Sequence, residues 1–253
     1  MLKFFLVLLL PSTFPFITIQ AQLNSNTTMT STKNTVYLLS GLGLDPAIFK
    51  RLEINANSIH HLRWIDPQKK ETLASYAQRM ATSITIPKEG NLILIGHSFG
   101  GITMQEISKI IPAQQIILIS SVKAKKEKSA GMNFWMRAFP VHHLAGRKLI
   151  LNSFKSWGKH HGYDSPESQE IFRNAVQQHS NYYFKWATTQ VCKWESEGIT
   201  TPIFHIHGTK DKTFPHKKVQ APATFIENGD HIMVFNRAQE VSALINQKLS
   251  ELK

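Results

Sequence analysis

Cysteine is almost absent from this 253-residue chain, which contains only Cys192. A single thiol cannot form a disulfide within the chain, and a chain of this length can bury a sizeable hydrophobic core without one. No turn signature surrounds Cys192, so we expect a buried, inert thiol rather than a nucleophile. The N-terminal region has no cysteine either, which excludes the lipid attachment of a bacterial lipoprotein.

Acidic residues are scarce relative to basic ones, with 17 against 29, and the formal net charge is +12. Such a surplus of positive charge could favour anionic surfaces or substrates. The one dense basic run consists of Lys123, Lys125, Lys126 and Lys128, and we interpret it as the solvated face of a loop. Because no helix-turn-helix, zinc-finger or RNA-binding signature accompanies this run, we expect no nucleic-acid partner, while weak association with anionic surfaces stays open.

The sequence also lacks the residue spacings that are typical of metal-binding sites. Histidines occur as adjacent pairs at positions 60–61, 142–143 and 160–161, and neighbouring side chains on a strand point to opposite faces, so such pairs are poor chelators. No HExxH or similar spacing occurs. The sequence therefore predicts no metal site.

A long apolar run occurs only at the N-terminus, where one lysine is followed by apolar residues up to Leu10. Pro11 and Pro15 interrupt the run, which disfavours a spanning helix of about 20 residues. The pattern is typical of a secretory signal peptide, which we assign to residues 1–21, followed by a flexible leader over 22–34. We therefore predict export, to the periplasm or as a secreted protein; the alternative is a membrane anchor formed by an uncleaved N-terminal segment.

The rest of the chain alternates apolar runs with helical patterns. Strands are expected at residues 35–39, 58–64, 91–95, 115–120, 202–207 and 223–226, and helices at 71–84, 99–110 and 232–253. Apolar runs without polar alternation are typical of strands buried on both faces of a parallel sheet. We therefore predict an α/β fold, with a mostly parallel sheet of about six strands flanked by helices.

The segment 122–198 departs from this pattern because it has no strand-like run and is rich in aromatic residues. We interpret it as a helical cap inserted into a core formed by residues 35–121 and 199–253. Aromatic side chains in such a cap could serve both as its own core and as the wall of a substrate pocket.

A tight turn is predicted at Gly96-His97-Ser98-Phe99-Gly100, between the strand at 91–95 and the helix that follows. A G-x-S-x-G sequence in this context is typical of a nucleophile elbow, which projects a strained serine above the sheet edge. Ser98 is therefore the candidate nucleophile. The alternative is a glycine-rich turn with an incidental serine.

A serine hydroxyl needs a base to take its proton, and the base needs a carboxylate to orient it. Asp211 and His231 each follow a predicted strand downstream of Ser98. Because the carboxyl ends of parallel strands share one edge of the sheet, we expect these three side chains to meet there.

Other histidines and carboxylates are weaker candidates for these roles. His205 and His207 lie on or at the end of a strand, where a structural role is expected, and His97 is expected to point away from Ser98. Asp230 directly precedes His231, so its side chain cannot easily turn back to orient the base.

Two backbone amides are candidate donors to a developing oxyanion. The glycine-rich turn Ser40-Gly41-Leu42-Gly43 follows the strand at 35–39 and exposes backbone N–H groups, among which Leu42 N–H is our candidate. The second candidate is Phe99 N–H, which follows the nucleophile directly. For the first turn the alternative is an ordinary connection between a strand and a helix.

Four motifs together resemble α/β-hydrolases of the cap-bearing kind over most of residues 35–250. They are SGLGLD at 40–45, GHSFGG at 96–101, HGTKD at 207–211 and NGDH at 228–231. The first motif resembles that of small bacterial hydrolases without an assigned substrate, although Ser40-Gly41 replaces the usual His-Gly.

The resemblance implies hydrolysis of a carboxylic ester or related small acyl substrate through an acyl-enzyme on Ser98. His231 would act as base and Asp211 as orienting acid, with no cofactor needed. A serine at this position argues against dehalogenases and epoxide hydrolases, which use aspartate. Carbon–carbon bond hydrolases, thioesterases and acyltransferases use the same triad and stay open, as do a non-catalytic binding module on this fold and a basic, surface-associated interaction protein.

Overall fold

A computed structural model describes residues 33–128 and 146–252. The predicted signal peptide and nearly all of the predicted leader lie outside these residues, so both stay predictions. The first strand begins at Asn34, which means that the last residue of the predicted leader already belongs to the sheet. Within the described ranges, no helix is both long and apolar enough to cross a membrane.

Six parallel strands form one sheet in the order β2-β1-β3-β4-β5-β6. The strands are β1 (Asn34–Leu39), β2 (Ser58–His61), β3 (Asn91–His97), β4 (Gln115–Ile119), β5 (Ile203–Gly208) and β6 (Thr224–Ile226). This confirms the predicted α/β fold with a parallel sheet. Every residue of β3 and β4 is buried, as expected for central strands that are covered on both faces.

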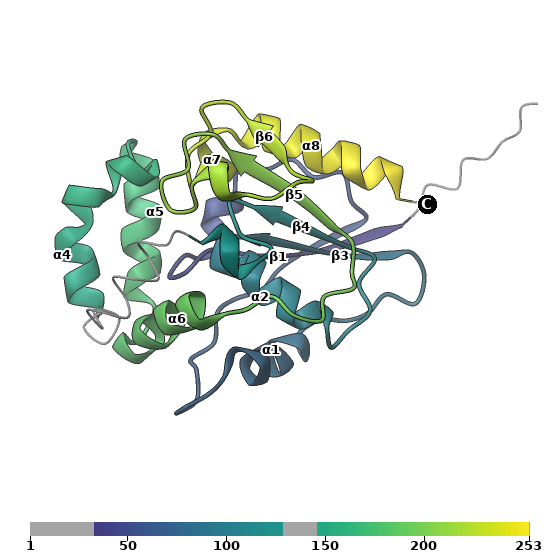
Figure 1. The fold of residues 1–253 in the computed structure, drawn as a ribbon, viewed down its shortest axis with the longest axis horizontal. Helices are drawn as coiled ribbons and strands as arrows, with labels where there is room; N and C mark the ends of the chain where they lie inside the picture. Colours follow the sequence, from purple (N-terminus) through teal and green to yellow (C-terminus); the bar gives the residue numbers. More distant parts are fainter. Residues whose placement is uncertain (1–32, 129–145, 253) are drawn as a thin grey trace, which may run out of the picture. The chain divides into compact units, whose positions relative to one another are not determined.

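Helices cover both faces of the sheet, as Figure 1 shows. Helices α1 (Leu73–Ala81) and α2 (Phe99–Ser108) pack together on one face, and α8 (Ala238–Glu251) packs on the other. The Thr72 side chain caps α1 by accepting a hydrogen bond from the Ser75 N–H. The apolar face of α1 then buries Leu73, Tyr76 and Met80.

Between β4 and β5 the described chain is helical, as predicted for the segment 122–198. Its elements are η2 (Lys125–Glu127), α4 (Arg147–Trp157), η4 (Lys159–His161), α5 (Pro166–Gln177) and α6 (Asn181–Lys193). Figure 1 shows α4, α5 and α6 beyond the carboxyl ends of the strands. We call these three helices and η4 the cap helices; the boundaries of the cap as a domain stay a prediction.

Aromatic rings hold the cap helices together. Phe154 of α4 stacks on Phe172 of α5, with ring centroids 4.2 Å apart and an angle of 11° between the planes. The rings of Trp157 and Tyr163 pack edge-on or tilted against this pair. Three further aromatic residues of the segment 122–198, Phe134, Trp135 and Phe139, lie outside the described residues.

Most predicted elements differ from the structure by a few residues at their ends, and two of the differences have a clear physical reason. The closing helix expected over 232–253 is divided into α7 (Met233–Asn236) and α8, because Arg237 has non-helical backbone angles (φ −124°, ψ 35°). The strand expected over 58–64 ends at His61, because the chain then leaves the sheet and places Trp64 against the turn after β1.

Candidate active site

Loops that follow four strands meet at the carboxyl edge of the sheet. The chain passes from β1 outward to β2 and then returns to β3 on the other side of β1. Such a reversal creates a crevice at the carboxyl ends of β1 and β3, and open α/β sheets bind their ligands in crevices of this kind. The turns after β1 and β3 border this crevice, and the loops after β5 and β6 reach it from the other half of the sheet.

The turn after β3 holds Ser98 in a strained conformation, with φ 52° and ψ −122°. The neighbouring strand β4 holds the backbone of this serine in place, because Ser98 N–H donates a hydrogen bond to the carbonyl of Ile119 at 3.0 Å. Ser121 also donates its hydroxyl hydrogen to the Ser98 carbonyl at 2.7 Å. A glycine is required at position 100, since a Cβ there would lie 2.2 Å from the carbonyl oxygen of Leu39.

The three residues predicted to meet at the sheet edge lie in one hydrogen-bonded row. His231 Nε2 lies 3.0 Å from Ser98 Oγ, and His231 Nδ1 lies 2.9 Å from Asp211 Oδ2. Ser98 and His231 are each 8% exposed and Asp211 is 3% exposed. When His231 is neutral, its Nδ1–H donates to the carboxylate and its Nε2 accepts the serine hydroxyl hydrogen, which is the tautomer that a general base requires.

The Asp211 carboxylate is held from two sides. Its second oxygen accepts hydrogen bonds from the N–H groups of Thr213 and Phe214 at 2.8 and 2.9 Å. Burial raises the pKa of Asp211, but the charge of His231 and the hydrogen bond from it outweigh burial and bring that pKa below its ordinary value. Asp211 is therefore ionised at neutral pH and can stabilise a positive charge on His231.

The weaker candidates are placed elsewhere. Asp230 accepts hydrogen bonds from the Ile232 N–H and from the Asn236 side chain. His207 donates Nε2–H to the Phe214 carbonyl at 2.8 Å, which is a structural contact beside Asp211. His97 donates Nε2–H to the His231 carbonyl at 2.9 Å, which supports the backbone of the candidate base; no pattern in the sequence indicates this contact.

Among the described residues, neither candidate oxyanion donor finds a partner for its N–H group. Within residues 33–128 and 146–252, neither Leu42 N–H nor Phe99 N–H has a hydrogen-bond acceptor. The next amide, Gly43 N–H, differs because it donates to the Tyr183 hydroxyl at 3.3 Å. Leu42 and Phe99 both line the same cavity as Ser98, so this cavity offers two unpaired donors beside the serine.

A cavity of about 190 Å³ lies above Ser98, between the sheet edge and the cap helices. Its lining consists of Gly41, Leu42, Leu44, His97, Ser98, Phe99, Trp157, His161, Tyr163, Phe172, Val191, Thr213, Phe214 and His231. The lining contributed by the described residues contains no lysine, arginine or carboxylate. Most of these side chains are apolar or aromatic, which favours a neutral, apolar ligand.

His161 is a polar residue of the cavity that sequence reasoning considered only as a possible metal ligand. Its Nδ1–H donates to the Trp157 carbonyl at 3.0 Å, which leaves Nε2 as an acceptor in the neutral ring. Burial lowers the pKa of His161 below its ordinary value. In the described part of the chain, no group of three or more His, Cys, Asp or Glu side chains could hold a metal ion.

Comparison with known proteins places this chain in one family. Residues 36–244 match the model of the alpha/beta hydrolase family, and the chain belongs to that family. No curated protein matches the chain.

Solved structures with the same fold include two esterases and a thioesterase. An esterase from Exiguobacterium antarcticum has a TM-score of 0.66 at 14% identity, over 86% of this chain and 92% of that one. A thermophilic esterase from Thermogutta terrifontis has a TM-score of 0.61 at 16% identity, over 88% and 91%. The RedJ thioesterase of the prodiginine pathway in Streptomyces coelicolor has a TM-score of 0.57 at 12% identity, over 87% and 85%. At these identities the likeness concerns the fold.

Proposed function

We propose that this protein is a serine hydrolase that cleaves a carboxylic ester or related acyl substrate through an acyl-enzyme on Ser98. The observation that carries the proposal is the row of hydrogen bonds from Ser98 through His231 to Asp211. The two unpaired amides of Leu42 and Phe99 beside the serine support it further. Family membership and the esterase and thioesterase structures favour a hydrolase of this kind.

The reaction follows from these positions. Ser98 Oγ attacks the substrate carbonyl carbon while His231 Nε2 takes the hydroxyl proton. The oxyanion accepts hydrogen bonds from Leu42 and Phe99, each worth about 3 kcal/mol in comparable sites. His231 then gives its proton to the leaving oxygen as the carbon–oxygen bond breaks.

Water completes the cycle. His231 takes a proton from a water molecule, whose oxygen attacks the acyl carbon, and the proton then passes to Ser98 Oγ as the acid leaves. Asp211 stays ionised throughout, keeping His231 in the required tautomer and stabilising its charged form.

The cavity supports a neutral, apolar acyl group as the substrate. No charged side chain among the described lining residues would pair with a carboxylate or an ammonium on that group, and burying an unpaired charge is costly. Aromatic residues from the cap helices line the same cavity as Ser98, so we expect this wall to select the substrate by the length and shape of its acyl group.

Active-site labelling with a fluorophosphonate, together with a panel of acyl esters of graded length and matched thioesters, tests the proposal. The wild-type protein is expected to be labelled once and to hydrolyse short to medium esters, whereas Ser98→Ala does neither. Asp211→Asn is expected to lower kcat by about 10³-fold to 10⁴-fold, because the base loses its orienting charge. Equal labelling of Ser98→Ala would rule out this nucleophile, and activity with thioesters alone would favour the thioesterase alternative.

A further inference from the structure

The turn over residues 40–44, which we call the oxyanion loop, is held by contacts from outside itself. The carbonyl oxygen of Gly41 accepts two hydrogen bonds, from Leu44 N–H at 3.0 Å and from the indole Nε1–H of Trp64 at 3.1 Å. A carbonyl oxygen has two lone pairs, so both acceptor positions of this carbonyl are used. Trp64 is 9% exposed and comes from the segment that follows β2.

Fixing this carbonyl also fixes the amide that the mechanism uses. The Gly41 carbonyl and the Leu42 N–H belong to one planar trans peptide unit, in which the two bonds point in opposite directions. A hydrogen bond that prevents rotation of the carbonyl therefore sets the direction of Leu42 N–H. The indole N–H of Trp64 bonds to the carbonyl oxygen of this peptide unit, on the side opposite the Leu42 N–H.

The same indole ring contacts the second oxyanion donor. Trp64 stacks on Phe99, with ring centroids 5.0 Å apart and only 9° between the planes. Phe99 is buried and forms the first residue of α2. One side chain thus contacts the peptide unit of the first candidate donor, through a hydrogen bond to the Gly41 carbonyl, and the ring of the second, through a stacked face.

Helix α6 supports the oxyanion loop from the cap. The Tyr183 hydroxyl accepts the hydrogen bond from Gly43 N–H, and the Tyr183 ring lies 6.0 Å from that of Trp64. Gly43 has φ +70°, and a Cβ at this position would lie 2.6 Å from the ring of Phe184. The backbone of the loop therefore packs directly against α6.

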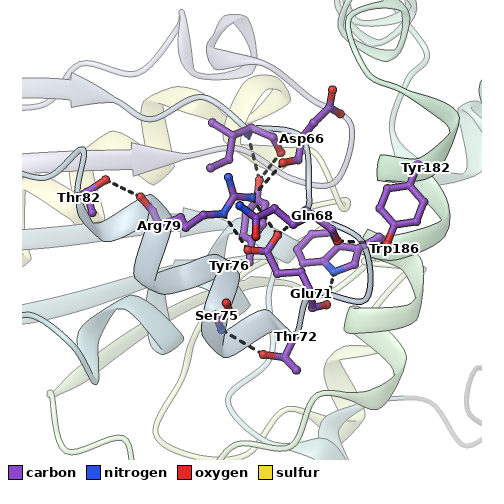
Figure 2. Close-up of polar contacts among 11 residues, drawn as sticks. Asp66, Gln68, Glu71, Thr72, Ser75, Tyr76, Arg79, Thr82, Tyr182 and Trp186 are labelled. Atoms are coloured by element: carbon purple, nitrogen blue, oxygen red, sulfur yellow. Dashed lines mark hydrogen bonds and ion pairs between the residues drawn. The ribbon is translucent and has the colours of Figure 1, made fainter.

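The segment that carries Trp64 is itself fastened to α1 and α6, as Figure 2 shows. Arg79 of α1 donates two hydrogen bonds to Glu71, at 2.8 and 2.9 Å. The indole N–H of Trp186 on α6 donates to the Glu71 carbonyl at 2.7 Å. The hydroxyl of Tyr76 donates to the Ile65 carbonyl and accepts from the Ile65 N–H, directly beside Trp64. Trp64 therefore projects from a rigid support.

We propose that Trp64 is a positioning residue that holds the two oxyanion donors in a fixed relative geometry, with Tyr183 as a second support from the cap. The inference rests on the proposed function, because it assigns Trp64 to the oxyanion site of that reaction. Trp64 does not line the cavity, so it acts through the Leu42 peptide and the Phe99 ring rather than on the substrate. We therefore expect Trp64 to affect the stability of the transition state, in which negative charge develops on the substrate oxygen.

The test compares Trp64→Phe with wild type in steady-state hydrolysis of the best ester from the panel. The phenylalanine ring keeps the stacking on Phe99 but removes the N–H donor. We expect kcat to fall about 10-fold with KM unchanged, which is less than the 10²-fold to 10³-fold loss that follows removal of a whole donor. Phenylboronic acid, which forms a tetrahedral adduct with the serine, should bind about 10-fold more weakly to Trp64→Phe.

Trp194→Phe is the matched control. Trp194 is also buried and also loses one indole hydrogen bond, which it donates to Glu106 at 2.7 Å, but it does not line the cavity. This control is expected to keep the wild-type kcat and boronate affinity. A purely structural role of Trp64 predicts instead that both variants lower the melting temperature and leave kcat and the boronate affinity equal to those of wild type.

A second variant keeps the inference testable if Trp64→Phe does not fold. Tyr183→Phe leaves Gly43 N–H without its acceptor and is expected to lower kcat about 3-fold at unchanged KM. Tyr37→Phe is its matched control, because it likewise leaves a backbone N–H, that of Thr85, without a tyrosine hydroxyl acceptor, but at a residue that does not line the cavity; it should keep the wild-type kcat. If wild type is inactive on every ester and unlabelled by fluorophosphonate, the proposed function fails. If wild type is active but the folded Trp64 variant, or Tyr183→Phe in its place, has a kcat equal to that of wild type, the positioning role alone is overturned.

Discussion

His97 Nε2 lies 2.9 Å from the carbonyl oxygen of His231, although 134 residues separate the two histidines. Burial, together with the nearby charge of His231, lowers the pKa of His97 to about 3, so the ring is neutral at physiological pH and donates Nε2–H. The residue before the proposed nucleophile thus supports the backbone of the proposed base. This contact joins the loop after β6 to the turn after β3.

Removal of the His97 hydrogen-bond donor is expected to make the position of His231 less fixed. His97→Phe leaves the His231 carbonyl without this partner in a buried site and should lower kcat/KM about 10-fold, since a lost hydrogen bond of this kind costs about 1–3 kcal/mol. His97→Gln carries an N–H donor on a side chain of similar reach and should recover most of the activity. The pH dependence of kcat/KM above pH 5 should be the same in all three proteins, because His97 does not titrate there. Equal rates for His97→Phe and wild type would contradict this role.

Acid stability is expected to depend on Glu71. Burial raises the pKa of Glu71, but hydrogen bonds from Arg79 and the Gln68 N–H, together with the Arg79 charge, outweigh it and bring that pKa below the ordinary 4.5. A depressed carboxyl pKa adds stability above pH 4.5 that disappears as pH falls through the folded-state value. Glu71→Gln should therefore lower the free energy of unfolding by about 1–2 kcal/mol at pH 7.

Urea unfolding of wild type and Glu71→Gln from pH 7 to pH 3 measures this effect. The difference in unfolding free energy should be constant down to about pH 5 and shrink below pH 4.5. Glu89→Gln is the control, because Glu89 pairs with Lys33 on the surface, where its side chain is 79% exposed, and such pairs contribute little. A difference that grows toward acid pH would contradict the sign of this prediction.

Trp157 is expected to limit the length of the acyl group. It lines the same cavity as Ser98, from α4, and packs edge-on against Phe154 and Phe172. Trp157→Leu removes part of this wall, so the ester length with the highest kcat/KM should increase by about two to four carbons. The panel of graded esters measures the shift. Leu149→Ala, an exposed position on the same helix, should keep the wild-type preference, and an unchanged profile for Trp157→Leu would place the acyl group elsewhere.

Cys192 is expected to be unreactive at neutral pH. Burial raises the pKa of its thiol to about 11, and the sulfur donates a hydrogen bond to the Thr188 carbonyl at 2.9 Å. Since the thiolate is the reactive form, iodoacetamide should modify the folded protein very slowly at pH 7.5 and faster as pH approaches 11. Pretreatment at pH 7.5 should leave the rate of fluorophosphonate labelling unchanged. Rapid modification at pH 7.5 accompanied by loss of activity would contradict an inert thiol.

The sequence allows the fold and the meeting of Ser98, Asp211 and His231 to be predicted because both depend on local patterns. Apolar runs mark strands, and in a parallel sheet each residue that directly follows a strand lies at the same edge. Ser98 is therefore placed near two residues that lie more than a hundred positions further along the chain, Asp211 and His231, without any knowledge of side-chain packing.

Supporting contacts could not be predicted in the same way. Trp64 was expected to continue a strand, and a periodic pattern holds no sign of its hydrogen bond to Gly41. His97 was expected only to point away from Ser98, and its bond to the His231 backbone depends on the conformation of a distant loop. His161 belongs to a histidine pair that was weighed only as a chelator. These contacts arise from the packing of elements that are far apart in sequence, and no single window of residues contains them.

The contacts that α6 makes with the oxyanion loop have a consequence for the re-engineering of such enzymes. Tyr183 and Phe184 hold Gly43 from the cap, while the neighbouring Trp186 holds the carbonyl of Glu71 in the segment that carries Trp64. Grafting a cap from another hydrolase onto this core would remove these contacts along with the substrate wall. Such a chimera would change turnover as well as selectivity, unless the first turns of α6 were kept with the core.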